Sequence, residues 1–572
     1  MLALLFLGAA LLLTHPLTES LGSALPGNLD DPLLNTWSLG WGAQWLGGGR
    51  DLWDAPIFYP HADTFAYSEH LLGISLFVAP VYWLTGNAVL MYNVALLGSF
   101  VLAGVGMYLL TAALTGRKDV AIVIALAFAC SPIRFGAQLT RLQMLMTGWL
   151  PLALWAIHRY AASGQHRYLV GFGISAFLLV LSNTYMLLIG ALPIAIVILF
   201  EVAHAPGRRW AHARDFGLAP GFVALLLWPV VDKYRDVQET MGFNRGEEEI
   251  ARYSATLRSY LSVYATTDWL PWVYPEQTAD RALYTGGTVL LLAGAALMTL
   301  TSNCVRKLAS RMRRGRFRDA RPAFAIGDAG TNRFTCYLLL TIAAVTLSFG
   351  PVVRDWQGDP IGRGPYYGLQ QLLPGIDGLR APARFGLVAA IGLGVIAGFG
   401  ATSLLASSPA ARRRIVLMTA TLFVLVEAWP VGFTIEPFGA SGRPGDQPLY
   451  TWLRQQAASS MVELPSSRHM AVGPNRALIY QYETLNHPHA LVNGSSGFHS
   501  PLADLIEGDT SPFRDPTLIA DAVLMLQTIA VRYVAVHTAD YEDPEFAAQV
   551  VNALRTAPGL AAHRQVRFQP SL

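Results

Sequence analysis

The feature that most constrains this chain is a series of long apolar stretches that recur from the N-terminus to residue 432, separated by short loops. A helix that crosses a membrane needs about 20 mostly apolar residues. Of the 572 residues, 53% are hydrophobic and 14% are charged, whereas soluble domains carry about 25% charged residues. A soluble fold could not bury this much apolar surface, and a disordered chain would contain far less of it. The pattern therefore predicts a polytopic membrane protein and excludes a fully water-soluble enzyme.

Several stretches are apolar enough to be considered as membrane helices. They are 1–17, 69–86, 88–115, 119–132, 142–160, 169–183, 185–203, 216–231, 286–303, 334–350, 385–406 and 414–432. The first could be a secretory signal peptide, but it lacks basic residues at its start and a clear cleavage site. We therefore expect an uncleaved first helix.

The distribution of Lys and Arg predicts which loops face the cytoplasm. Basic clusters lie at 117–118, 159–167, 208–214, 306–321 and 412–414, whereas the segment 18–68 carries Arg50 as its one basic residue beside six acids. The basic clusters can all face the cytoplasm while 18–68 faces outward only if 69–86 does not cross the membrane. Pro80 in the middle of this stretch is typical of a broken or re-entrant helix. We predict about 11 spans, with the N-terminus inside and 232–285, 351–384 and 434–572 outside.

An alternative reading of the topology stays open. In it, 69–86 crosses the membrane and the short stretch 119–132 does not. This reading changes the side of the 117–118 loop alone.

Composition predicts two domains. Residues 1–433 form a transmembrane domain whose first outer loop is 18–87, and 434–572 form a small extracytoplasmic α/β domain, because polar residues return there. Strand-like runs occur at Met461–Leu464, Ala477–Tyr482, Ala490–Val492 and Ile529–His537, and helix-like runs at Leu449–Ala458, Pro516–Gln527 and Glu545–Ala557. The expected fold class is an α-helical membrane bundle with this domain attached.

Common catalytic signatures are missing from the sequence. It contains no Walker A loop, zinc-protease motif, nucleophile elbow or EF-hand loop, and its three cysteines have no metal-binding spacing. No cofactor is therefore certain; a divalent metal is possible but no ligand pattern indicates one. We expect no nucleic-acid partner. The small residues between Gly392 and Gly398 lie in an apolar stretch and predict close helix packing.

The first outer loop holds the most informative pattern. Pro32 is placed to start a helix that Asp31 caps, and Leu33, Trp37, Trp41 and Trp45 then recur every four residues. Because Trp favours the membrane–water boundary, this stripe predicts a helix lying flat on the outer surface.

That helix would hold Asp30 and Asp31 at its N-terminus, where the partial positive charge favours an ionised carboxylate. Such a carboxylate can activate an acceptor hydroxyl for attack on a sugar carried by a lipid phosphate. The simpler interpretation is that Asp31 only caps the helix. Downstream, His61 in Phe58–His61 and the pair Glu69 and His70 are candidate substrate-binding residues.

A departing lipid phosphate also needs cationic groups. Arg134 and Arg141 depart from the positive-inside pattern, Gln143 follows on the next helix, and Arg384 begins another outer helix. The alternative is that the arginines extend to outer headgroups. Arg380 flanks the same helix start as Arg384 and raises the same choice, and Arg245 is a candidate with weaker support. His487 and His489 would form a metal pair only with a third ligand nearby, and we expect them in a surface loop.

The architecture resembles the GT-C superfamily of membrane glycosyltransferases. The resemblance covers about residues 1–430 and is carried by many spans, a large first outer loop and an early acid in that loop. The segments similar to an uncharacterised bacterial branch are Asp31–Trp37, Phe58–His61, Tyr67–Gly73 and Arg380–Phe385, with Val462–Pro465 and Leu491–Phe498 in the outer domain.

The resemblance implies an inverting enzyme of the bacterial inner membrane and cell envelope. Its partners would be a polyprenyl-phosphate-linked sugar donor, membrane lipid and a glycan, lipid or protein acceptor. By position, Asp31 would be the catalytic base, although which of Asp30 and Asp31 acts stays open. Some members carry a second acid in the next outer loop, but residues 133–141 hold Arg134 and Arg141 instead, which puts metal-dependent variants in doubt. Two other classes remain: a lipid or polysaccharide transporter, and an inactive GT-C-like scaffold.

Overall fold

A computed structural model describes residues 1–205, 207–243, 245–264, 270–313, 329–372, 375–431, 433–438, 448–466 and 475–561. These residues form two compact units. Unit 1 comprises Met1–His15, Leu96–Trp228 and Asn244–Phe433, and unit 2 comprises Pro16–Ala95, Pro229–Phe243 and Thr434–Leu572. Two segments from the first 243 residues therefore belong with the C-terminal part of the chain.

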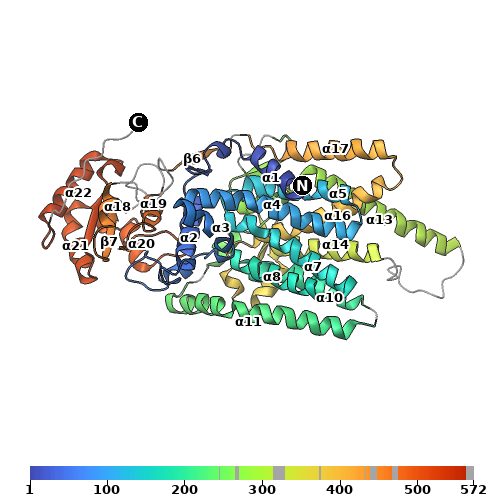
Figure 1. Ribbon diagram of the computed structural model, residues 1–572, viewed down its shortest axis with the longest axis horizontal. Coiled ribbons are helices and arrows are strands. Elements are labelled where there is room, and N and C mark those ends of the chain that lie inside the picture. The colour runs from blue at the N-terminus through green and yellow to red at the C-terminus, as the bar shows by residue number, and fades with distance from the viewer. Residues whose placement is uncertain are drawn as a thin grey trace. The chain divides into compact units, whose positions relative to one another are not determined.

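Unit 1 is mainly helical, and most of its labelled helices lie roughly along one direction in Figure 1. The helix α16 contacts α5, α13 and α14, while α7 packs on α8 and α10. The bounds are α1 Leu2–Leu13, α5 Lys118–Ala129, α6 Leu142–Leu145, α7 Trp149–Ser163, α8 His166–Ser182, α9 Met186–Ile189, α10 Ala191–Ala203, α12 Glu247–Arg252, α13 Gly287–Arg313, α14 Ala329–Ser348, α15 Pro365–Leu372, α16 Phe385–Leu405 and α17 Ala410–Glu427. Two long helices, α4 Ala88–Thr115 and α11 Arg209–Met241, continue from one unit into the other.

This is an integral membrane protein with a mostly helical fold. Among the described residues, 5 helices are long and apolar enough to cross a membrane: Ala88–Thr115, Lys118–Gly136, Met186–Ala203, Arg209–Met241 and Pro382–Leu405. The second of these extends the predicted stretch 119–132 to 19 residues, so its length no longer argues against crossing. The predicted 69–86 stretch contains α3, Leu72–Thr85, with Pro80 inside the helix.

Close packing around α16 explains its small residues. A side chain at Gly400 would place its Cβ 2.0 Å from the carbonyl oxygen of Leu292 on α13, and at Gly392 it would lie 2.2 Å from Oγ1 of Thr341 on α14. Helix backbones can approach this closely only where no side chain intervenes. The packing role predicted for Gly392–Gly398 is confirmed.

Two buried acids connect helices of unit 1. Glu201 on α10 lies 2.6 Å from Nδ1 of His158 on α7, whose Nε2 lies 3.0 Å from the Tyr337 hydroxyl on α14. Glu427, at the end of α17, accepts hydrogen bonds from the backbone nitrogens of Gly287 (2.7 Å) and Thr288 (3.2 Å). Glu427 thus satisfies the first amide groups of α13 and places a negative charge at the positive end of that helix.

Removing the Glu427 carboxylate should therefore destabilise unit 1. We expect Glu427→Ala to lower the free energy of unfolding by about 1–3 kcal/mol, because two backbone donors and the Thr288 hydroxyl lose their acceptor. Thermal unfolding of the detergent-solubilised chain measures the effect. The control is Glu248→Ala, on the exposed surface of α12, and equal stability of the two variants would contradict this role.

Short strands and 3-10 helices complete unit 1. Strands β2 Ser262–Tyr264 and β3 Tyr274–Glu276 pair in parallel, and β4 Val352–Arg354 and β5 Pro360–Arg363 pair antiparallel. Four described 3-10 helices lie near these strands in the sequence: η5 Leu257–Leu261, η7 Ala279–Arg281, η8 Ile376–Gly378 and η9 Pro382–Arg384. Pro382 begins η9, where its missing N–H costs no hydrogen bond.

Unit 2 joins the first loop to the C-terminal residues. Strand β1 Ala24–Pro26 pairs antiparallel with β6 Ile435–Pro437, and α2 Asp31–Leu46 packs on α3 and α19. A three-stranded parallel sheet has the order β8-β7-β9, with β7 Ser460–Leu464, β8 Ala490–Leu491 and β9 Tyr533–Val536. The helices of this part are α18 Pro448–Leu453, α19 Arg476–Glu483, α20 Pro501–Glu507, α21 Ile519–Thr528 and α22 Pro544–Thr556 (Figure 1).

The sheet corrects one secondary-structure prediction. Residues Ala477–Tyr482, predicted as a strand, lie inside helix α19. Of these six side chains, all but Ile479 are buried, so burial does not alternate as it would in a strand with one covered face. The aromatic residues gave this run a β-like composition, but tertiary packing decided its structure.

The aromatic stripe of α2 is covered by protein. Trp37 and Trp41 are buried, and only Trp45 keeps 37% of its surface exposed. The indole N–H of Trp37 donates to the Thr484 hydroxyl at 3.1 Å, and that of Trp41 donates to the Leu52 carbonyl at 2.7 Å. The helix itself is confirmed, but its stripe packs inside unit 2, which overturns the expectation that it faces the membrane boundary.

Candidate functional site: a cluster of arginines and acids

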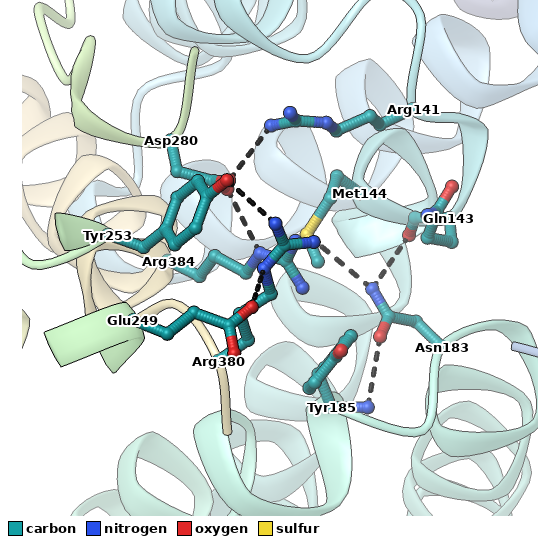
Figure 2. A network of polar contacts seen from close by, with 10 residues as sticks. All are labelled: Arg141, Gln143, Met144, Asn183, Tyr185, Glu249, Tyr253, Asp280, Arg380 and Arg384. Atoms are coloured by element: carbon teal, nitrogen blue, oxygen red, sulfur yellow. Dashed lines mark hydrogen bonds and ion pairs between the residues drawn. The ribbon is translucent and has the colours of Figure 1, made fainter. Parts of the chain in front are cut away.

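Unit 1 contains a polar cluster that unites three of the arginines singled out from the sequence. We call Arg141, Arg380, Arg384, Glu249 and Asp280 the arginine cluster (Figure 2). Arg141 directly precedes α6, Asp280 lies in η7, and Arg384 ends η9 where α16 begins. Glu249 lies on α12. Segments far apart in the sequence therefore converge on one place.

Asp280 holds the centre of the cluster. Its Oδ2 lies 3.1 Å from Nη1 of Arg141, and its Oδ1 accepts a hydrogen bond of 3.0 Å from Nε of Arg384. The Asp280 side chain is 3% exposed, compared with 8% for Arg384 and 20% for Arg141. Burial would raise the pKa of Asp280, but Arg384 and Arg141 overcome this and lower it to about 2. One ionised carboxylate thus fixes two guanidinium groups.

Arg380 forms the more exposed side. Its Nε lies 2.9 Å from Oε1 of Glu249, its Nη2 donates to the Tyr253 hydroxyl at 2.7 Å, and its side chain is 36% exposed. Arg245 also binds Glu249, with Nη1 to Oε1 at 3.2 Å. Glu249 thus binds both Arg380 and Arg245, as Asp280 binds both Arg141 and Arg384.

Aromatic and amide groups border the arginines. The guanidinium carbon of Arg384 lies 4.5 Å from the ring centroid of Tyr185. Asn183, just after α8, donates from Nδ2 to the Gln143 carbonyl at 3.1 Å (Figure 2). Gln143 is therefore near this cluster through its backbone. Guanidinium groups bind phosphate oxygens with two parallel N–H donors, and this partly exposed, arginine-rich cluster has the chemistry of an anion site.

Arg134 differs from the other predicted cations. It is completely buried, and its guanidinium donates to the carbonyls of Ala129 (3.2 Å), Ser99 (3.4 Å) and Leu145 (3.0 Å) and to the Thr147 hydroxyl (2.9 Å). The rings of Phe100 and Phe128 also lie beside it. These contacts connect segments of the bundle, so we do not carry Arg134 into the proposed site.

The predicted acids lie in unit 2. Asp31 is the first residue of α2 and Asp30 occupies the capping position before it; both are half-buried. Asp30 accepts a hydrogen bond of 3.0 Å from Nδ2 of Asn28. The carboxylate of Asp31 lies within electrostatic range of the buried Tyr92. The helix thus begins one residue earlier than Pro32, and Asp31 is inside it.

The other first-loop candidates have separate environments. His70 is buried, its Nδ1 accepts the Leu72 amide at 3.0 Å, and its ring contacts Trp53 and Tyr234. His61 is half-buried and donates its backbone N–H to the Phe58 carbonyl at 3.0 Å. Glu69 is half-buried beside His70. His70 therefore shapes the start of α3.

Sequence reasoning missed Asp280 and Glu249. The only available signal was their position in the predicted outer segment 232–285, because nothing in their spacing connects them with Arg141 or Arg384. Among the residues that the structure describes, no group of three or more His, Cys, Asp or Glu side chains is placed to hold a metal ion. The pair His487 and His489 is buried, which corrects the expected surface loop.

Comparisons with known proteins give structural likeness alone. No protein-family model and no curated protein matches the chain. The structure is similar to the arabinofuranosyltransferase AftD from Mycobacteria, with a TM-score of 0.58 and 17% identity, over 99% of this chain and 37% of AftD. This chain thus spans little more than a third of that protein.

Two structures of the Archaeoglobus fulgidus oligosaccharyltransferase are also similar. The apo form has a TM-score of 0.46 and 11% identity, over 93% of this chain and 69% of that one. The form with Zn and sulfate has a TM-score of 0.46 and 13% identity, over 94% and 68%. On the likeness to AftD, the chain has the fold of GT-C glycosyltransferases.

Proposed function

We propose that this chain, which has the GT-C fold, is a membrane glycosyltransferase. It transfers a sugar from a polyprenyl-phosphate-linked donor to an extracytoplasmic acceptor with inversion, in the bacterial inner membrane. The proposal includes about 11 spans, with residues 434–572 as an α/β domain outside. It includes Asp31 as the general base that takes the proton of the acceptor hydroxyl.

One observation carries this proposal: the arginine cluster in a chain of this fold. When a glycosyl bond to phosphate breaks, the leaving oxygen gains negative charge, and preorganised guanidinium groups stabilise it. Asp280 holds the Arg141 and Arg384 groups at 3.1 and 3.0 Å. The folded protein therefore orients these two guanidinium groups before the substrate binds. We assign the donor phosphate to this cluster and keep Glu69, His70 and His61 as proposed substrate-side residues.

Changing one arginine should weaken donor binding. We expect Arg141→Gln to reduce the affinity for polyprenyl phosphate by about tenfold to hundredfold, because a charge-assisted hydrogen bond contributes about 1.5–3 kcal/mol. A second variant, Arg384→Lys, keeps the positive charge at this buried position but loses the planar pair of guanidinium N–H donors. We expect it to weaken polyprenyl-phosphate binding as well. Isothermal titration of the detergent-solubilised chain with polyprenyl phosphate measures both.

The matched control is Arg363→Gln, on an exposed ion pair with Glu247 at 3.3 Å in the same unit. It should bind polyprenyl phosphate like the unmodified chain. The same preparations, supplied with a polyprenyl-phosphate-linked sugar, report transfer. Unchanged binding and transfer in folded Arg141→Gln and Arg384→Lys would remove the arginine cluster from the mechanism.

A further inference from the structure

Unit 1 contains an apolar cavity between four of its helices. The cavity has a volume of about 30 Å³, and every side chain that lines it is apolar, including Val123 on α5, Leu292 on α13, Leu404 on α16 and Val416 on α17. The helix α5 contacts the other three (Figure 1). Leu404 is 57% exposed and Val416 is 41% exposed, so the cavity opens to the surface between α16 and α17.

The opening is placed where lipid can reach it. The helices α5 and α16 belong to two of the described helices that are long and apolar enough to cross a membrane, Lys118–Gly136 and Pro382–Leu405. Water gains no hydrogen bond in a cavity without polar lining, so such a cavity stays dry or takes an apolar group. The hydrocarbon chain of a surrounding lipid is an apolar group that can enter.

Basic residues gather at one end of this cavity. Those on the α5 side are Arg117 and Lys118, directly before the lining residue Val120, and those on α17 are 412–414, directly before Val416. Nε of Arg413 lies 3.4 Å from Oδ2 of Asp119, which brings the two basic segments together. The cavity therefore has a charged end and an apolar interior.

The charges at this end do not cancel. Asp119 is the one acid in the segments 117–120 and 410–416, which hold five Arg and Lys residues. Its carboxylate accepts hydrogen bonds of 2.9 and 2.8 Å from Nε and Nη2 of Arg117. Arg117 is 23% exposed and Arg413 is 38% exposed. Each guanidinium has five N–H donors, so Asp119 accepts only part of what the two arginines offer to an anion.

A lipid with an anionic head group fits both parts of this arrangement. Basic pockets between membrane helices bind the head groups of anionic phospholipids. Positive charge alone would only determine which side of the membrane this end faces, whereas the adjoining apolar cavity also accommodates part of a chain. Its small volume suits the narrow, unbranched chain of a phospholipid better than a polyprenyl chain, which carries methyl branches.

This place is separate from the arginine cluster. The helix α16 begins at Phe385, beside Arg384, and ends at Leu405, which lines the cavity. A helix of 21 residues with a rise of about 1.5 Å per residue separates its ends by about 30 Å. The cavity thus lies at the opposite end of α16 from the proposed site of the donor phosphate.

We infer that this cavity and its basic end form a binding site for an anionic phospholipid. The phosphate binds Arg117 and Arg413, and part of one acyl chain enters the cavity between α16 and α17. The inference stands on unit 1 alone and does not depend on the proposed function.

Native mass spectrometry of the full chain in detergent measures the binding of single lipids. The probes are dioleoyl phosphatidylglycerol, dioleoyl phosphatidylcholine, which has the same chains and no net charge, and glycerol phosphate, which has no chains. We expect phosphatidylglycerol to bind at least fivefold more tightly than phosphatidylcholine, and glycerol phosphate not to displace it. Equal affinity for the two lipids, or displacement by glycerol phosphate, would overturn the inference.

The charged end is tested with Arg413→Gln, which should preserve the fold because the side chain is partly exposed. We expect it to weaken the binding of phosphatidylglycerol by about fivefold, the contribution of one cation near an anionic membrane surface. The matched control is Arg209→Gln, which removes an exposed arginine at the first residue of α11 and should bind phosphatidylglycerol normally. Full affinity in Arg413→Gln would contradict the site.

The apolar part is tested with Ala420→Leu, which fills the cavity from α17. Excluding one or two CH₂ groups of the chain should weaken binding by about fourfold to fifteenfold. The control Ala162→Leu makes the same enlargement on the exposed surface of α7. Thermal unfolding verifies that both variants fold, and full affinity in folded Ala420→Leu would contradict entry of the chain.

Two further measurements separate this site from the proposed donor site. Arg141→Gln should bind phosphatidylglycerol like the unmodified chain, even where its binding of polyprenyl phosphate is lost. Polyprenyl phosphate should not displace the bound phosphatidylglycerol. Displacement, or loss of phosphatidylglycerol binding in Arg141→Gln, would mean that the phospholipid occupies the donor site instead, and the inference would be wrong.

Discussion

Replacing Asp280 by Asn should destabilise unit 1 more than any other single change in the arginine cluster. Asp280 is buried and is the counter-charge of both Arg141 and Arg384. Removing one partner of a buried ion pair leaves uncompensated charge, at a cost of about 3–5 kcal/mol. We expect a fall of this size in the free energy of unfolding, measured by unfolding in detergent, and weaker binding of polyprenyl phosphate.

Asp280→Asn should also change how the free energy of unfolding depends on pH. The pKa of Asp280 is about 2 in the folded protein, below its ordinary value of 3.8. A lowered folded pKa means that ionisation stabilises the folded state above pH of about 4, and that this contribution is lost as the pH falls toward 2. The unmodified chain should therefore lose more stability than Asp280→Asn over this interval.

An exposed ion pair provides the control for Asp280. Glu247→Gln removes the partner of Arg363, whose side chain is 50% exposed, and such surface pairs contribute about 0–1 kcal/mol. It should leave both stability and acid sensitivity almost unchanged. If Asp280→Asn matched this control in both measurements, the carboxylate would not organise the arginines.

The sequence predicted those features that depend on local pattern. Pro32 and the four-residue spacing of Trp37 and Trp41 correctly indicated the helix at 31–46. The same spacing could not identify what covers the stripe, because the Thr484 hydroxyl that binds Trp37 is 447 residues away. An apolar stripe has the same composition whether lipid or protein covers it.

Predictions from the charge pattern had the same limit in the arginine cluster. Arg141 and Arg384 were singled out because they depart from the positive-inside pattern, but Arg134 departs from it equally and is fully buried within the bundle. Arg141 and Arg384 differ from Arg134 because they bind Asp280, which is 104 residues from Arg384 in the sequence. Charge statistics locate a side of the membrane, whereas only the fold shows which opposite charge each arginine meets.

Replacing Asp31 by Asn should abolish transfer while the fold is kept. A general base contributes about 10²–10⁴-fold to the rate, so we expect kcat to fall by that factor with little change in KM for the donor. Asparagine has the size of aspartate and remains compatible with the start of α2, although the loss of negative charge there costs about 0.3–1 kcal/mol. Thermal unfolding verifies the fold, and transfer from a polyprenyl-phosphate-linked sugar reports the rate.

Asp30→Asn is the matched control for the base. Asp30 precedes α2 and accepts a hydrogen bond of 3.0 Å from Asn28, so its carboxylate has a local structural partner. Asp31, inside the first turn, lies where the backbone amides of the helix best favour a negative charge. We therefore expect Asp30→Asn to retain most of the transfer activity. Both variants remove one negative charge, one residue apart, so they differ only in which carboxylate is lost. If Asp31→Asn kept full transfer activity, or if Asp30→Asn lost it instead, the assignment of the base to Asp31 would be wrong.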